Sequence, residues 1–254
     1  QTCSEPFIRK KIYYSLKNIK YNTIWHWGVI SKIKYLNESI IRDFADKFDW
    51  DLISSNQKLS ESFIREFQDK VHWPYTTRYQ RLSISFIREF QNKVNWYTIS
   101  GWENLSESFM REFADKLDWI HMSQYQILSE SLIRDFADKL NWKYISQYQK
   151  LSESIIRDFA DKVNWRIISI HQKLSESFIS EFAIVIDKFE ISRCQKLSES
   201  FIRKFHYLVD WIMISRYQTL SESFIREFVH KVDWEYICEF QKLSESFIRE
   251  FQDK

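Results

Sequence analysis

The sequence predicts an all-α fold, an α-solenoid of about eleven two-helix repeats. A leucine recurs every 23 residues, at Leu36, Leu59, Leu82, Leu105, Leu128, Leu151, Leu174, Leu197, Leu220 and Leu243. Around each leucine the chain repeats a stretch that reads DWDLISSNQKLSESFIREFQDKV in residues 49–71. Two glycines and two prolines in 254 residues leave few glycine or proline turns. The chain is therefore expected to reverse direction through helix caps.

The second half of the repeat predicts a helix that begins after Ser60. A serine is a favoured N-cap, and Glu61 in the first turn suits the helix dipole. Leu59, just before the cap, can pack against Ile64 as a hydrophobic staple. The pattern extends this helix to about Val71.

One face of the second helix is expected to be buried. Its apolar residues are spaced by one, three and four positions, at Phe63, Ile64, Phe67 and Val71. On the other face Glu61 can pair with Arg65, Arg65 with Asp69, and Glu66 with Lys70. Such exposed pairs contribute roughly 0.2–0.5 kcal/mol each, so burial of the apolar face is expected to stabilise the helix more.

The first half of the repeat predicts another short helix, which starts at a tryptophan. In Val163-Asn164-Trp165 the asparagine can cap the helix and Val163 can pack against Ile168. The helix is about two turns long and ends near Gln-Lys-Leu. Isolated helices below about 12–15 residues are marginal in water, so stacking must stabilise the array. We expect Trp and Phe pairs buried between neighbouring repeats to contribute about 1.5–3 kcal/mol per side chain.

Residues 1–254 read as one repeat domain with two irregular places. The first repeat is atypical and carries a ten-residue insert around 11–24. The repeat around 184–190 is degenerate, because Lys188 stands where tryptophan is expected. Its spacing is kept, so the stack should continue with looser packing. Drift in one repeat and a bend or contact site both fit this departure.

Composition argues against several classes of function. The net charge is +2, and the charged residues, 28% of the chain, are interspersed, which favours neither nucleic acid nor a membrane. No apolar run reaches the length of a transmembrane helix. The three cysteines share no spacing and are expected to be free thiols, and the histidines lack metal-ligand spacing. We therefore expect no enzymatic activity, cofactor or metal.

Arginines recur once per repeat, at Arg42, Arg65, Arg88, Arg111, Arg134, Arg157, Arg203, Arg226 and Arg249. A row of arginines could follow a phosphate backbone. An acidic residue follows most of them directly, however, and would cancel their field. A nucleic-acid partner is therefore not expected.

The variable positions of the first helix are the candidate partner-binding residues. Aromatic residues and arginine there suit interface hot spots. The candidates are Tyr79, Trp102, Tyr125, Tyr148, Arg216, Tyr217 and Phe240. Solvent exposure without selection would produce the same variation, so both interpretations stay open.

The repeat W-x-x-I-S-x-Y-Q-K-L-S-E-S-F-I-R-E-F-x-D-K-V-D/N resembles the tandem repeats of uncharacterised proteins encoded by large (giant) DNA viruses. The resemblance covers nearly the whole chain and implies a viral protein of the host cytoplasm or virion. It implies no site residue. The predicted function is a non-enzymatic scaffold that binds other proteins. The alternative is a structural component of a virion or other assembly, which associates end to end through uncapped solenoid ends.

Overall fold

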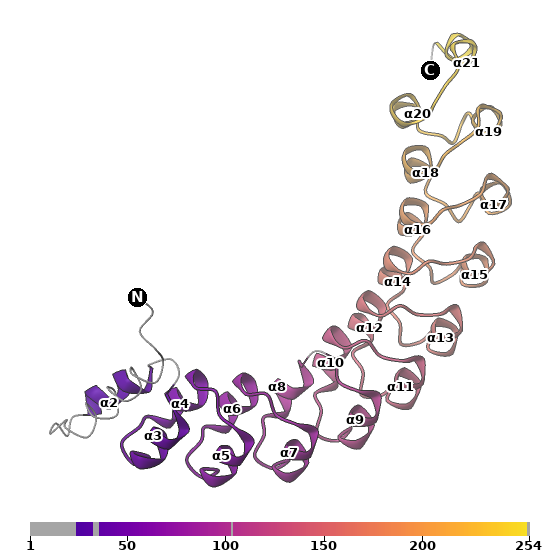
Figure 1. The fold of residues 1–254 in the computed structure, drawn as a ribbon. Helices are drawn as coiled ribbons and strands as arrows, with labels where there is room; N and C mark the ends of the chain where they lie inside the picture. Colours follow the sequence, from indigo (N-terminus) through magenta and orange to yellow (C-terminus); the bar gives the residue numbers. More distant parts are fainter. Residues whose placement is uncertain (1–23, 33–35, 103, 253–254) are drawn as a thin grey trace. The chain divides into compact units, whose positions relative to one another are not determined.

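The chain folds as an α-solenoid of short helices in regular repeats, as the sequence predicts. A computed structural model describes residues 24–32, 36–102 and 104–252, and no strand occurs within them (Figure 1). The expected insert around 11–24 lies outside these residues except for Ile24. The described residues contain ten helix pairs, one pair per repeat.

The first helices of the repeats form one row. They are α2 (Ile24–Ser31), α4 (Trp50–Asn56), α6 (Trp73–Tyr79), α8 (Trp96–Ser100), α10 (Trp119–Tyr125), α12 (Trp142–Tyr148), α14 (Trp165–His171), α16 (Lys188–Cys194), α18 (Trp211–Tyr217) and α20 (Trp234–Phe240). The second helices are α3 (Glu38–Asp43), α5 (Glu61–Glu66), α7 (Ile84–Glu89), α9 (Glu107–Glu112), α11 (Glu130–Asp135), α13 (Glu153–Asp158), α15 (Glu176–Glu181), α17 (Glu199–Lys204), α19 (Glu222–Glu227) and α21 (Glu245–Glu250).

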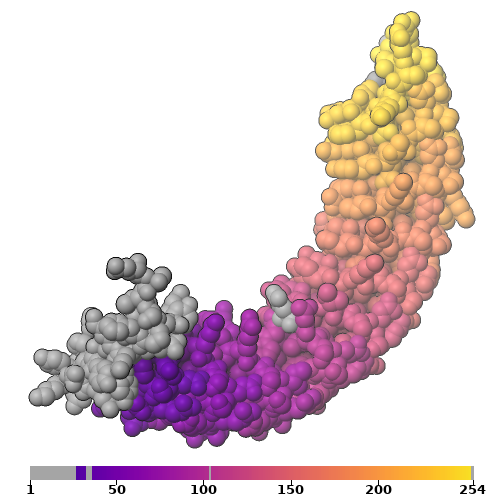
Figure 2. Space-filling view, in the orientation of Figure 1, coloured from indigo at the N-terminus to yellow at the C-terminus, as the bar shows by residue number. Residues whose placement is uncertain are grey.

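The repeats fall into two compact units. Unit 1 comprises Gln1–Trp102 and Glu112–Asp118, and unit 2 comprises Glu103–Arg111 and Trp119–Lys254. In unit 1 each first helix from α2 to α8 contacts the next, and in unit 2 the same holds from α10 to α20. The surfaces of successive repeats in unit 2 lie directly against one another (Figure 2). Each repeat is therefore stabilised chiefly by its neighbours in the chain.

The first helices begin and end where the sequence predicts. Most of them are seven residues long and start at the tryptophan. In α14 the side chain of Asn164 accepts a hydrogen bond from the backbone N–H of Ile167 at 3.0 Å. Asp233 caps α20 in the same way, through Tyr236 at 3.2 Å. Local capping therefore defines these helix starts.

The second helices are shorter than predicted. Ser60 does cap α5, since it accepts from Phe63 N–H at 3.2 Å, but the helix ends at Glu66 and not near Val71. Beyond Glu66 a turn follows, in which the N–H groups of Lys70 and Val71 both donate to Phe67 O, at 2.9 and 3.0 Å. The N–H of His72 then donates to Ser54 Oγ in the preceding repeat at 2.9 Å, and Gln68 O accepts from the Trp73 indole at 2.9 Å. These two bonds hold the residues at the start of α6.

The predicted apolar face is buried, but the tryptophans pack differently from the prediction. Phe63 and Ile64 are fully buried. Trp50 is half-buried and stacks on Phe67 of its own repeat, with ring centroids 5.0 Å apart. The Trp and Phe pair therefore joins the two helices of one repeat. Contacts between repeats depend on other groups.

In most repeats a buried or half-buried glutamine joins the repeat to the one before it. Gln172 Oε1 accepts from the N–H of Leu151 at 3.0 Å, and its Nε2 donates to the carbonyls of Ser146 and Gln149 at 3.0 and 2.8 Å. We call this set of bonds the glutamine bridge. It recurs in full at Gln80, Gln149, Gln195, Gln218 and Gln241.

A buried serine makes a second link between repeats. Ser169 Oγ donates to Trp165 O at 2.7 Å and accepts from the N–H of Asp187 in the next repeat at 3.3 Å. Serine or threonine makes the same pair of bonds in most repeats.

The arginines form a charged link between second helices. Arg65 pairs with Glu61 in its own helix at 3.8 Å and with Glu89 of the next repeat at 2.8 Å, and its guanidinium lies over Phe86. The sequence had predicted Asp69 as its second partner. Equivalent pairs across 24 residues involve Arg42, Arg88, Arg111, Arg134, Arg157, Arg203 and Arg226. The arginine row is thus matched by carboxylates of the next repeat.

Candidate binding surface on the first helices

The position that ends most first helices, Tyr79 in α6, is exposed in most repeats. Six of the seven candidate residues occupy this repeat position in the sequence, and five of them end a first helix. They are Tyr79, Tyr125, Tyr148, Tyr217 and Phe240, and each is 44–59% exposed. The remaining face of the same helices is buried and carries the serine position. The helix therefore has one constant face toward its neighbours and one variable face toward solvent.

Trp102 occupies the same position of the repeat but lies outside the helix. Helix α8 ends two residues earlier, at Ser100, with Gly101 as its C-cap. The backbone N–H of Trp102 donates to Ile99 O at 2.9 Å. Asn104 has a φ of 59°, which asparagine tolerates better than most residues. Trp102 is half-buried, whereas the other five candidate residues at this position are exposed.

In unit 2, Arg216 brings three aromatic rings together. Its guanidinium lies 5.2 Å from the ring centroids of Tyr217 and Tyr236 and 5.3 Å from that of Phe240. Two consecutive first helices, α18 and α20, supply these residues. The cluster gives Arg216 one fixed position between flat apolar surfaces. Tyr236 was not among the sequence candidates.

An ion-pair cluster that the sequence did not reveal lies on α14 and α16. Glu190 is 2% exposed, and its carboxylate pairs with Arg166 at 3.2 Å and with Arg193 at 2.7 Å. Burial raises the pKa of Glu190, but hydrogen bonds from Arg193 and Arg166 outweigh it and hold that pKa below its ordinary value of 4.5. The carboxylate therefore stays ionised and orients both guanidiniums. The only sequence signal was the degenerate repeat.

The degenerate repeat around 184–190 keeps the helix cap and the glutamine bridge that its neighbours have. Asp187 caps α16 through Glu190 N–H at 3.0 Å, and Gln195 makes its complete glutamine bridge. Lys188 replaces the tryptophan, and its Nζ donates to Tyr207 O at 3.3 Å. The stack thus continues through this repeat, while one indole is exchanged for an exposed ammonium group. A site that binds through charge could use such a change.

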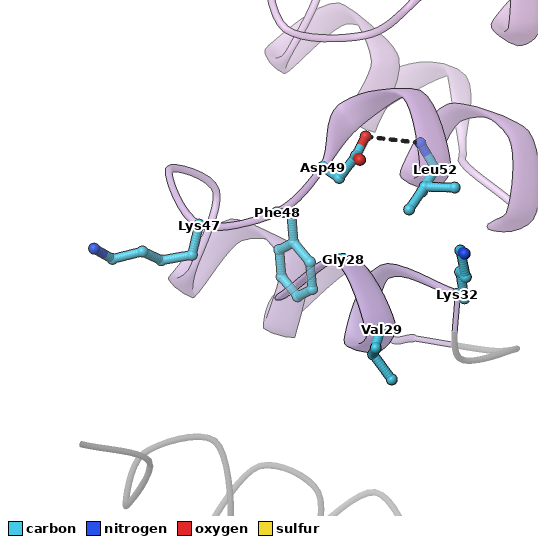
Figure 3. Close-up of a pocket in the computed structure, with 7 residues that line it drawn as sticks. All are labelled: Gly28, Val29, Lys32, Lys47, Phe48, Asp49 and Leu52. Atoms are coloured by element: carbon cyan, nitrogen blue, oxygen red, sulfur yellow. Dashed lines mark hydrogen bonds between the residues drawn. The ribbon is translucent and has the colours of Figure 1, made fainter. Parts of the chain in front are cut away.

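A shallow hollow in unit 1 lies between α2 and α4 (Figure 3). Its lining residues are Gly28, Val29, Lys32, Lys47, Phe48, Asp49 and Leu52. Asp49 is the cap of α4 and accepts from Leu52 N–H at 3.2 Å, as the dashed line shows. Lys47 points away from the other side chains. The one carboxylate therefore serves the helix, and the hollow offers no arrangement suited to acid-base chemistry.

Other features give no chemical site. Across residues 24–32, 36–102 and 104–252, no group of three His, Cys, Asp or Glu side chains could hold a metal ion. In that same part of the chain, every helix is too short or too polar to cross a membrane. Cys194 and Cys238 are free and exposed. The surface of the first helices remains the strongest candidate.

Comparison with protein-family models, with curated proteins and with solved structures finds no match to this chain.

Proposed function

We propose that the protein is a non-enzymatic scaffold that binds other proteins through the exposed surface of its first helices. One observation supports this most. Residues that form the core and the bridges between repeats hardly change, whereas the exposed positions of the first helices differ from repeat to repeat. An array of this kind presents different exposed side chains on helices whose buried contacts are the same in each repeat.

The exposed residues have the chemistry of an interface. Tyrosine and arginine are enriched at interface hot spots, and both combine a large apolar area with a polar group, whereas phenylalanine contributes apolar area alone. Buried hydrogen bonds hold the underlying helices, so little conformational entropy would be lost on binding. Tyr125, Tyr148 and Tyr217 are the residues of unit 2 on which we expect binding to depend most.

A peptide selection tests the proposal. A phage-displayed peptide library is selected on the immobilised chain, and enriched peptides are measured against the variant Tyr125→Ser/Tyr148→Ser/Tyr217→Ser. We expect the variant to lose at least about tenfold in affinity. The matched control, Ile84→Ser/Ile184→Ser/Ile248→Ser, removes exposed apolar area outside the first helices and should leave affinity unchanged. Equal affinity for both variants would contradict the choice of surface.

Light scattering separates this role from the structural alternative. A scaffold should keep a mass near 31.3 kDa across a concentration series while it binds the selected peptides. A mass that rises with concentration, with no peptide bound at any step, would instead favour self-assembly.

A further inference from the structure

Positive charge gathers on four consecutive first helices of unit 2. Helices α12, α14, α16 and α18 carry five basic side chains and one carboxylate, Glu190. The basic residues are Lys143, Arg166, Lys188, Arg193 and Arg216. Since Glu190 is buried, the solvent-facing charge of this row is almost entirely positive. We call these five residues the basic patch.

The basic patch has clear limits. The preceding helix, α10, has no Asp, Glu, Lys or Arg, and the following helix, α20, has Glu235 and Glu239 but no basic residue. The second helices of the same region, α11, α13, α15 and α17, carry seven carboxylates and four basic residues. The net charge of +2 for the whole chain thus conceals a local separation of charge.

The charged and aromatic groups of the patch form one connected surface. Glu190 holds Arg166 and Arg193 on neighbouring helices. On the next first helix, Arg216 lies over the ring of Tyr217. Arg166 keeps 71% of its side chain exposed and Arg193 keeps 38%. Both arginines therefore retain donors for a further acceptor.

We propose that the basic patch, with Tyr148, Phe189 and Tyr217 beside it, is the docking site for an acidic segment of a partner protein. Glutamate or aspartate side chains of that segment contact Arg166, Arg193 and Arg216, and its apolar side chains pack on the aromatic rings. Helices pack about 8–10 Å apart, so the four helices span roughly 30 Å. An extended segment of about nine residues has this length. The inference rests on the function proposed above and specifies the partner's chemistry.

Protein suits the surface better than nucleic acid. A phosphate backbone that followed the row of first helices would meet Glu235 and Glu239 on α20. It would also meet a site where Glu190 already neutralises part of the charge. A short acidic segment can end before α20, and its carboxylates match the planar guanidinium groups of arginine.

Three labelled peptides test the proposal against the full chain. Each has twelve residues, as three copies of Glu-Phe-Glu-Ser, Gln-Phe-Gln-Ser or Lys-Phe-Lys-Ser, and binding is measured by fluorescence polarisation. We expect the Glu peptide to bind at least about tenfold more tightly than the Gln peptide, with affinity that falls as salt rises. Equal affinity for the Glu and Gln peptides would overturn the proposal.

Charge reversal locates the site. Arg193→Glu/Arg216→Glu should lose the Glu peptide and gain the Lys peptide, which also shows that the variant is folded. Lys58→Glu/Arg81→Glu makes the same change of charge at exposed positions of unit 1 and should bind the Glu peptide normally. Retention of the Glu peptide by Arg193→Glu/Arg216→Glu would refute the assignment.

Two further outcomes are informative. If oligo(dT) binds more tightly than the Glu peptide and the Arg193→Glu/Arg216→Glu variant abolishes this, the patch is a nucleic-acid site and the proposal fails. If the selected library peptides need Tyr125, Tyr148 and Tyr217 but are not acidic, the scaffold function stands and only this inference fails.

Discussion

Thr76 is a residue whose side chain does not fit its surroundings. It lies in α6 at the repeat position that is Ile53, Ile99, Ile145 or Ile168 elsewhere, and it is completely buried. Its Oγ1 has no hydrogen-bond partner among the described residues. Burying a hydroxyl group without a partner is unfavourable. The array tolerates this at one of many equivalent positions.

We predict that Thr76→Ile stabilises the chain. The change removes an unpaired hydroxyl and restores the usual apolar side chain, so the free energy of unfolding should rise by roughly 1–3 kcal/mol. Chemical denaturation measures it. Thr77→Val is the control, because Thr77 Oγ1 donates to Trp73 O and accepts from Asn95 N–H. That neighbouring change should destabilise the chain, and stabilisation by both would contradict the argument.

Glu190 predicts a pH dependence at the scale of one residue. A carboxylate whose pKa is lower in the folded chain stabilises it above the unfolded pKa, and this stabilisation is lost as pH falls through the folded pKa. Glu190→Gln should therefore lower the free energy of unfolding at pH 7 by roughly 1–2 kcal/mol, less than for a pair with both ions buried, because Arg166 is exposed. The difference from wild type should shrink as pH falls below 4.5.

The control for Glu190 is Glu235→Gln on α20, an exposed position. It should change stability by less than about 0.5 kcal/mol at any of these pH values. A constant deficit of Glu190→Gln from pH 7 down to pH 3 would show that the side chain acts through packing and not through charge.

At the scale of the element, most first helices are joined to the preceding repeat by the glutamine bridge. One side chain satisfies one donor and two acceptors of the preceding repeat, all buried. Glutamine suits this position because it has both an acceptor and a two-proton donor. Glutamate lacks the donor. Glu103, outside the described residues, stands at this position of the sequence and is the first residue of unit 2.

We predict that Gln172→Leu destabilises unit 2 strongly. The leucine can fill the space but leaves Leu151 N–H without its glutamine acceptor, and each buried group left unpaired costs roughly 1–3 kcal/mol. Thermal unfolding followed by circular dichroism is the measurement. Lys173→Leu, next in the chain and exposed, should have little effect. Similar losses for the two variants would show that the bridge does not stabilise the array.

At one place in the chain, both residues of the usual ion pair between second helices are replaced. Ser180 stands at the arginine position and Lys204 at the acidic position 24 residues later. Elsewhere these two positions form an ion pair, as between Arg157 and Glu181. A lysine opposite an arginine would be repulsive, so the two changes compensate each other. Arg203 and Glu227 resume the pairing in the next repeat.

For the whole molecule, contacts at fixed sequence separations imply that whole repeats are interchangeable. The links between successive repeats recur at fixed separations, chiefly 18, 21, 22, 23, 24 and 26 positions. Removal of residues 129–151 deletes one period and brings Gln172 to the separation from Leu128 that Gln149 now has. Because stability in such arrays is nearly a sum over neighbours, the loss should be limited.

We predict that deletion of 129–151 leaves a cooperatively folded chain with unchanged helicity per residue and a lower unfolding midpoint. Circular dichroism and urea denaturation test this. Deletion of 129–140 removes only part of a period, so the bridges that span the deletion fall out of register, while those between later repeats keep their spacing. This control should lose the contacts between the repeats on either side of the deletion and unfold with lower cooperativity. If both deletions fold equally well, contacts between repeats do not depend on register.

The sequence by itself determined the period, the starts of the helices, their caps and their apolar faces. These depend on residues within about four positions of one another, as Asn164 and Ile167 show. The tertiary structure decided the rest. Gln172 looks like a solvated polar residue in the sequence, because its partners in the preceding repeat lie 21–26 residues away.

The candidate surface was likewise predicted only in part from the sequence. Variation along the chain identified Tyr125, Tyr148 and Tyr217, because exposure leaves a position free to change. The Glu190 cluster could not be predicted, since a carboxylate surrounded by lysine and arginine in sequence reads as solvated surface. Only the packing of α14 against α16 buries Glu190 between two arginines. Burial and charge pairing depend on neighbours in space, which only the stacked repeats supply.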